Sequence, residues 1–144
     1  MRQGRRKINK DFGNKYPKFL KAKFPEMFDE SCIEIAIGEG WSHIVTSLCS
    51  AIQFQIDHND PDQIKVLQIK EKFGGLRFYA SGCNDYLQGM ISFAESLSYR
   101  TCEFCGSTQD IGRTGGWIKT ICKECATEEK SKRGDFSWTQ REED

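Results

Sequence analysis

This chain has very little histidine, and its positive and negative charges are equal in number. Only two histidines occur in 144 residues, and the formal net charge at neutral pH is zero. The two imidazoles, His43 and His58, leave little material for acid–base catalysis or for a histidine-ligated catalytic metal. The sequence also has no His-x-Glu element, Walker phosphate loop, dinucleotide-binding glycine fingerprint or serine nucleophile elbow. These absences favour a protein that is not an enzyme.

Long apolar runs are missing as well. No stretch of about 18 apolar residues is present, and the basic opening MRQGRRKINK is not followed by the apolar segment of a signal peptide. We therefore expect a cytoplasmic protein with no membrane contact. A chain of zero net charge also has no global attraction for nucleic acid.

The charges are unevenly distributed along the first 60 residues. Residues 1–23 contain nine Lys or Arg and one acid, for a net charge of +8, whereas residues 24–60 contain seven acids and no Lys or Arg. We predict a basic flexible arm over residues 1–13. Either the two segments solvate and pair loosely with each other, or the arm binds phosphates or an acidic partner. The candidate partner-binding residues of this arm are Arg5, Arg6 and Lys7.

The segment 14–100 is predicted to form an α+β domain. Pro17 and Pro25 each have to lie near the start of a helix, which predicts two short helical pieces over 14–28. The glycines of Gly38-Glu39-Gly40 supply permissive backbone for a turn. Apolar periodicity and turn residues predict the remaining elements. These are a helix over 41–55 that ends before DHNDPDQ, a strand over 64–72, a Gly74-Gly75 hairpin turn, a return strand over 77–80, and a helix from Asn84 or Asp85 to about Tyr99.

Two Cys-x-x-Cys pairs near the C-terminus are the strongest chemical signal in the sequence. Two residues between ligands let both sulfurs of a pair face one ion, and four thiolates complete the tetrahedral shell of a structural zinc. Iron is the alternative ion, and two disulfides or buried free thiols are the alternatives to a metal. We predict one structural zinc ion. Its ligands are Cys102, Cys105, Cys122 and Cys125.

The module around these cysteines is predicted to span residues 101–132. A turn at Thr114-Gly115-Gly116 lies between two short apolar runs, and helix formers follow Cys125. The order of knuckle, hairpin and helix predicts a treble-clef finger, with a zinc ribbon as the alternative. Residues 133–144 show no periodic pattern and are expected to form a mobile tail. The other cysteines, expected to be small buried hydrophobes, are Cys32, Cys49 and Cys83.

The predicted β-hairpin interleaves basic and aromatic side chains. Such a combination can pair with phosphates and stack on exposed bases. Strict alternation offers a simpler explanation, because it places Leu76 and Phe78 on a core face and Arg77 and Tyr79 on a wet face. The candidate partner-binding residues of the hairpin are Lys70, Lys72, Arg77 and Tyr79.

The run KEKFGGLRFY, the following helix with Ala94-Glu95 and Ser98, the CxxCG knuckle and the Gly-Trp before the second CxxC resemble a family of small proteins of bacteria and their phages. The resemblance covers residues 16–127. It implies a phage or prophage context and no activity, ligand or catalytic residue.

Three functions remain open at this stage. The preferred one is a non-enzymatic, zinc-binding regulatory or counter-defence protein that binds a host protein. A nucleic-acid-binding accessory that uses the arm, hairpin and finger is the alternative, which zero net charge disfavours. A metal-dependent nuclease is the minor alternative, because His-Asn-His nucleases place a histidine beside their cysteine pairs, and here no histidine follows His58.

Overall fold

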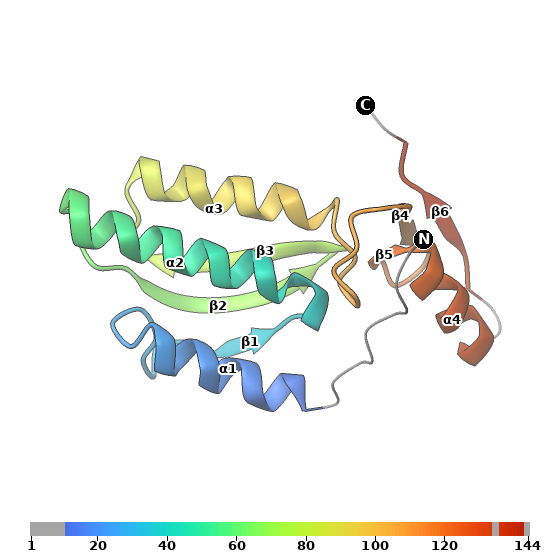
Figure 1. The fold of residues 1–144 in the computed structure, drawn as a ribbon, viewed down its shortest axis with the longest axis horizontal. Coiled ribbons are helices and arrows are strands. Elements are labelled where there is room, and N and C mark those ends of the chain that lie inside the picture. The colour runs from blue at the N-terminus through green and yellow to red at the C-terminus, as the bar shows by residue number, and fades with distance from the viewer. Residues whose placement is uncertain (1–10, 134–135, 143–144) are drawn as a thin grey trace.

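The protein has an α+β fold with two small sheets, as the sequence predicted (Figure 1). A computed structural model describes residues 11–133 and 136–142. The helical elements are α1 (Phe12–Lys23), the 3-10 helix η1 (Glu39–Trp41), α2 (Ser42–Asn59), α3 (Asp85–Ser98) and α4 (Lys123–Arg133). The strands are β1 (Glu34–Ala36), β2 (Lys65–Lys72), β3 (Gly75–Ser81), β4 (Ile111–Thr114), β5 (Thr120–Cys122) and β6 (Trp138–Gln140).

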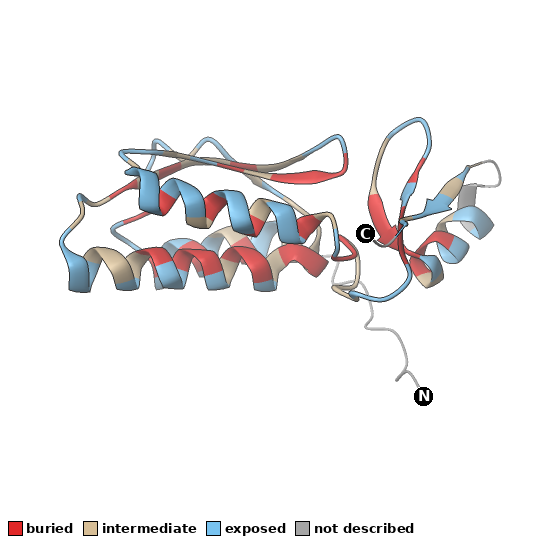
Figure 2. Ribbon diagram, turned by 90° about the horizontal axis from the view of Figure 1, so that it is seen from above, coloured by how far each residue is buried: buried red, intermediate tan, exposed pale blue. Residues whose placement is uncertain are grey.

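The first sheet has the order β1-β2-β3, with β1 parallel and β3 antiparallel to β2. Helices α2 and α3 cover one face of this sheet (Figures 1 and 2). The β2–β3 hairpin is confirmed, but its turn lies one residue earlier than the predicted Gly74-Gly75 turn: Phe73 and Gly74 have positive φ values, and Gly75 already begins β3. The short strand β1, which the sequence did not predict, completes a β1–α2–β2 crossover.

The main hydrophobic core lies between the helices and the inner face of the first sheet. Helix α2 buries apolar side chains at three- and four-residue steps, while β3 buries Leu76 and Phe78 and leaves Tyr79 exposed. The predicted division of the hairpin into a core face and a wet face is therefore confirmed. Trp41, just before α2, is completely buried, so its large ring contributes strongly to the core.

Helix α3 protects the free edge of β3. The Ser98 hydroxyl accepts a hydrogen bond from the Leu76 amide at 2.9 Å, and the Glu95 carboxylate accepts one from the Phe78 amide at 2.9 Å. An edge strand with unpaired amides would otherwise be open to pairing with another chain. The start of α3 follows the sequence prediction, because the Asn84 side chain accepts the Leu87 amide as an N-cap.

Two helix boundaries differ from the sequence prediction. Helix α1 is one helix with Pro17 in its interior instead of two short pieces, and its buried residues Tyr16 and Leu20 lie on either side of the proline. Burial of these side chains offsets the hydrogen bond that proline removes. Helix α2 continues into the predicted turn segment as far as Asn59, and it ends where Asp60 adopts a left-handed conformation. The added residues are exposed, so local contacts such as the stacking of His58 on Phe54 stabilise this end of the helix, and burial does not.

The second sheet has the order β5-β4-β6, and with α4 it forms a smaller core around the cysteines. Strand β6 lies within the segment 133–144, for which the sequence predicted a mobile tail. Trp138 holds this strand in place by donating a hydrogen bond from Nε1 to the Ile121 carbonyl at 3.0 Å. Its ring also packs on Gly112, where a β-carbon would come within 2.4 Å of it. A three-residue strand that depends on such contacts has no periodicity to detect.

None of the helices in the described part of the chain combines the length and apolarity needed to cross a membrane.

Candidate metal centre

The structure brings all four predicted ligands together. Cys102 and Cys105 lie in the knuckle that follows α3, Cys122 ends β5, and Cys125 lies in the first turn of α4. Their sulfur atoms all lie within 4.8 Å of one another, and the Cys105 and Cys122 Sγ atoms are 3.8 Å apart. A tetrahedral ion with metal–sulfur bonds of about 2.3 Å requires sulfur–sulfur distances of about 3.8 Å. These four cysteines can therefore hold a metal ion.

Both cysteine pairs adopt the same local turn. The Cys105 amide donates to the Cys102 sulfur at 3.4 Å, and the Cys125 amide donates to the Cys122 sulfur at 3.4 Å. Such bonds favour the thiolate form that a metal needs. After the first pair, Gly106 has a φ of +82° and donates its amide to the Cys102 carbonyl at 2.9 Å. A side chain at this left-handed position would be strained.

The cysteine thiols of the site differ in pKa. A hydrogen bond from Cys125 is the main reason why the pKa of Cys102 falls to about 5, while burial is the main cause that raises the pKa of Cys105 to about 11. The pKa of Cys125 is raised, because its proton is held in the hydrogen bond to Cys102. Metal binding must displace these protons.

The order of elements around the site distinguishes the two finger types left open by the sequence. A knuckle carries the first pair, the β4–β5 hairpin follows, and the second pair spans the end of β5 and the start of α4. This order is that of a treble clef. The four thiols also fit zinc chemically, since zinc accepts four thiolates without redox change, and a filled shell leaves no position for a reacting water.

The knuckle is packed against the segment that joins β1 to α2. The Gly40 amide donates to the Glu103 carbonyl at 2.8 Å, and the Trp41 indole donates to the Thr101 carbonyl at 2.9 Å. A β-carbon on Gly40 would come within 2.1 Å of the Cys102 carbonyl oxygen. Gly40 is therefore required for the close approach of two backbones, a role that the sequence interpretation of Gly38-Glu39-Gly40 as a turn did not include.

A partly buried ionic network joins the knuckle to the β2–β3 hairpin. Glu103, between the first two cysteines, is only 3% exposed and accepts the Gly38 amide at 2.9 Å. Lys119 lies 3.3 Å from Glu103 and 3.6 Å from Glu71. Burial raises the pKa of Glu103, and Lys119 opposes this shift. Sequence reasoning missed this network, because Glu103 looked like a spacer within the Cys-x-x-Cys pair.

The tip of the β2–β3 hairpin also contacts the metal module, which consists of the two cysteine pairs, the second sheet and α4. The Thr120 hydroxyl at the start of β5 donates to the Gly74 carbonyl at 2.6 Å. A β-carbon on Gly74 would come within 2.9 Å of the Ile118 side chain. Gly74 therefore both closes the hairpin and allows the metal module to approach it closely.

The predicted partner-binding residues of the hairpin lie on the sheet face opposite the core. Lys70 and Arg77 are directly opposite each other in the β2–β3 register, and Tyr79 is opposite Gln68. The Arg77 guanidinium donates to the Tyr99 hydroxyl at 3.2 Å. The predicted arm residues Arg5, Arg6 and Lys7 lie outside the described residues.

The histidines lie outside the cysteine cluster. His43 is exposed on α2, and His58 stacks on Phe54 near the end of the same helix, with ring centroids 4.1 Å apart. Within residues 11–133 and 136–142, the four cysteines are the one cluster of potential metal ligands. Cys49 is buried in the main core, and burial raises its pKa, whereas Cys32 and Cys83 are half-buried.

No family model, curated protein or solved structure matches this chain. The phage context therefore stays a prediction from the sequence.

Proposed function

We propose that the protein is a non-enzymatic regulator that binds one structural zinc ion and docks a host protein on the outer surface of α2 and α3. The observation that carries this proposal is an exposed apolar stripe on α3. Tyr86 and Phe93 are 64% and 66% exposed, and Leu97 adds a third apolar side chain one turn further on. Exposed apolar patches of this kind mark protein interaction sites.

The stripe is distinct from the face of α3 that packs in the core. Three buried positions of α3 each adjoin an apolar residue that is exposed or half-buried. These buried positions are Leu87, Ile91 and Ala94. Helix α3 is therefore apolar on two neighbouring faces, of which only one is covered. A surface helix normally keeps its second face polar, so the uncovered stripe supports a docking role. Helix α2 lies beside α3 and runs antiparallel to it (Figure 1), and its Phe54 is a further apolar side chain that is 57% exposed.

The charge of this surface favours a protein partner. No Lys or Arg occurs between Ser42 and Ile64 or between Phe78 and Tyr99, so both helices lack basic residues. A phosphate backbone would find no counter-charge here. The acids of the two segments suit a partner helix whose apolar face is flanked by basic residues. They are Asp57, Asp60, Asp62 and Asp85, whereas Glu95 accepts the Phe78 amide instead.

The zinc ion has a structural role in this proposal and does not contact the partner. The closed four-thiolate shell suits a structural ion, and the knuckle supports the Gly40–Trp41 segment at the start of α2. The proposal also includes a phage or prophage origin, which the sequence resemblance implies, a counter-defence role in that context, and the cytoplasmic location expected from the sequence, in which no apolar segment follows the basic opening.

Affinity capture from bacterial host lysate tests the docking surface. Wild-type protein and Phe93→Gln serve as baits, with Ile33→Gln as the matched control, because Ile33 is equally exposed but lies outside α2 and α3. We expect a partner that wild-type and Ile33→Gln retain and Phe93→Gln loses. Titration with the purified partner should then show at least a tenfold weaker Kd for Phe93→Gln, the loss typical of an interface hot spot. Equal binding by all three proteins would refute the proposed surface.

The outer face of the first sheet favours nucleic-acid binding as a second candidate function. Lys70 and Arg77 face each other directly across β2 and β3, a like-charge pairing that destabilises a sheet by itself. An anionic ligand would relieve this repulsion. A salt titration of oligonucleotide binding tests it: affinity should fall linearly on a log–log plot, and Lys70→Gln should reduce the slope.

A further inference from the structure

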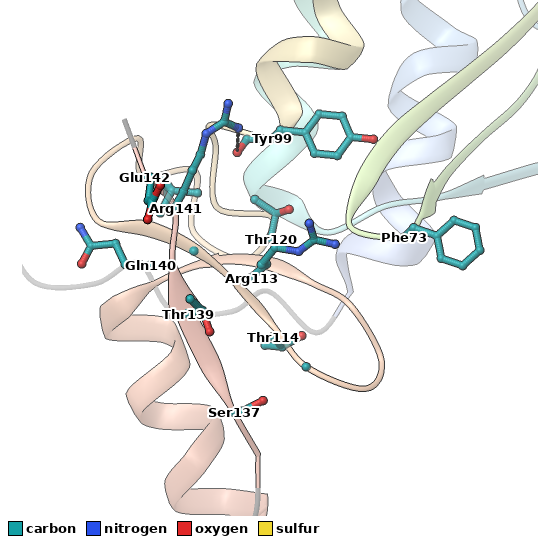
Figure 3. Close-up of a pocket in the computed structure, with 13 residues that line it drawn as sticks. Phe73, Tyr99, Arg113, Thr114, Thr120, Ser137, Thr139, Gln140, Arg141 and Glu142 are labelled. Atoms are coloured by element: carbon teal, nitrogen blue, oxygen red, sulfur yellow. Dashed lines mark hydrogen bonds between the residues drawn. The ribbon is translucent and has the colours of Figure 1, made fainter. Parts of the chain in front are cut away.

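A cavity of about 530 Å³ lies between the metal module and the first domain. Its walls come from three elements that are distant in sequence: the hairpin tip at Phe73, the end of α3 at Tyr99, and the face of β4 and β6 (Figure 3). Arg113 and Arg141 also line it. Neither the predicted ligands nor the proposed docking surface includes these four residues.

Strand register places both arginines on one face of the second sheet. Arg113 on β4 is opposite Thr139 on β6, and Arg141 follows Thr139 by two residues. Residues two apart on an extended chain share a face. The Arg141 amide also donates to the Ile111 carbonyl at 2.7 Å, which continues the pairing beyond β6. Figure 3 shows the Arg113 side chain extending from β4 toward the space between Tyr99 and Phe73.

The two guanidinium groups differ in how they are held. Arg141 donates to the Tyr99 carbonyl at 3.1 Å, which fixes its position at the rim. In the part of the chain that the structure describes, no hydrogen bond or ion pair engages the Arg113 guanidinium. One carboxylate, Glu142, also lines the cavity. The lining therefore keeps a net positive charge, with one guanidinium anchored and one available.

Aromatic rings flank this positive charge. Phe73 is 69% exposed at the hairpin tip and has a positive φ of 52°. The Lys72 ammonium lies 5.8 Å from the centre of its ring. Tyr99 connects the cavity to the outer face of the first sheet, because its hydroxyl accepts a hydrogen bond from Arg77.

We propose that this cavity binds a nucleotide, with its phosphate on Arg113 and Arg141 and its base stacked on Phe73. Guanidinium groups bind phosphate through paired, charge-assisted hydrogen bonds, and exposed aromatic rings stack on bases of any sequence. The nucleotide is either free or part of a single strand, and both present the same chemistry to the cavity. The site shares no residue with the α2–α3 surface, so it does not depend on protein docking there.

Fluorescence anisotropy with a labelled oligothymidine at low salt tests the site. Arg113→Gln and Phe73→Leu probe the phosphate and the base, and Lys18→Gln is the matched charge control on the exposed side of α1. We expect Arg113→Gln to weaken binding about tenfold, the loss of a charged hydrogen-bonding partner. It should also lower the salt slope by about 0.7, the value for one phosphate contact on a single strand. Phe73→Leu should weaken binding about fivefold or more through lost stacking, and Lys18→Gln should bind like wild type.

Competition identifies the source of the phosphate. Displacement of the probe by thymidine monophosphate at concentrations near those of the oligonucleotide supports a free nucleotide, whereas displacement by the oligonucleotide alone supports a single strand. Absence of binding at low salt, or equal binding by wild type and Arg113→Gln, would overturn the site. If Arg113→Gln weakens binding and Phe73→Leu does not, or if a phosphoserine peptide competes as well as the nucleotides, the assignment to nucleotides is wrong.

Discussion

Replacing Gly40 by Ala should separate the metal module from the rest of the protein. Gly40 lies directly under the knuckle, and an added β-carbon would come within 2.1 Å of the Cys102 carbonyl oxygen and 2.5 Å of the Gly106 amide nitrogen. Both neighbours are backbone atoms of a turn that is fixed by the cysteine pair. Neither can move aside as the end of a flexible side chain can.

The expected cost follows from the contacts that must open. The Gly40 amide would lose the Glu103 carbonyl, and the Trp41 indole beside it would lose the Thr101 carbonyl. Overpacking costs about 1 to 3 kcal/mol and each lost hydrogen bond about 0.5 to 1.5 kcal/mol, so we expect Gly40→Ala to lower the free energy of unfolding by about 2 to 6 kcal/mol. This is a large part of the stability of a small domain, about 5 to 15 kcal/mol.

Urea unfolding of purified protein under reducing conditions measures the effect. The matched control is Gly89→Ala, because a β-carbon at Gly89 in α3 meets nothing within 4 Å. The same substitution should there stabilise the helix by about 0.5 to 1 kcal/mol. Trp41 fluorescence should shift to longer wavelength in Gly40→Ala, because its buried indole becomes exposed to water, while the metal content should stay unchanged.

All four ligands lie within residues 102–125, so a packing defect at Gly40 should leave the metal bound. Measuring the metal content therefore distinguishes a packing defect from loss of the metal site. If Gly40→Ala unfolds within about 0.5 kcal/mol of wild type, as an ordinary surface substitution does, the close packing of the knuckle on Gly40 is refuted. Loss of the metal together with unchanged Trp41 fluorescence would also contradict the reasoning.

Two further substitutions test the metal centre and the edge of β3. Cys122→Ser should abolish stoichiometric zinc binding, measured by elemental analysis, and unfold the metal module, because structural zinc contributes about 10 to 16 kcal/mol to the folding of small fingers. Cys83→Ser is the control and should retain the ion. Unchanged thermal stability of Cys122→Ser would refute a structural role of the ion. Ser98→Ala should destabilise the protein by about 1 to 3 kcal/mol, because it leaves the buried Leu76 amide without its acceptor. The exposed Ser96→Ala is its control in thermal unfolding, and equal midpoints would contradict the proposed edge protection.

The sequence predicted features whose causes are local. The Cys-x-x-Cys spacing, the β2–β3 hairpin and the Asn84 cap each depend on a few neighbouring residues, although the hairpin turn lies at Phe73-Gly74, one residue before the predicted position. For such features, residue type and spacing already define the chemistry or the backbone conformation. Alternation along the hairpin likewise predicted which side chains of β3 lie in the core.

Features that depend on distant partners were not predictable in this way. Strands β1 and β6 have three residues each, too few to show a period, and each exists because a neighbouring strand pairs with it. The helix interior position of Pro17 was not predicted, because local propensity is weaker than burial of Tyr16 and Leu20. These differences come from packing energy that a single-sequence pattern does not contain.

The sequence by itself determined that this protein has a four-cysteine centre, a β-hairpin and an α+β composition, because ligand spacing and hydrophobic periodicity depend on residues that are close together in the sequence. Only the tertiary structure decided that Gly40 supports the knuckle, that Glu103 joins it to the hairpin through Lys119, and that Arg113 and Arg141 line one cavity with Tyr99. These contacts join residues that are mostly dozens of positions apart, and they form only when burial of the two cores brings their backbones together.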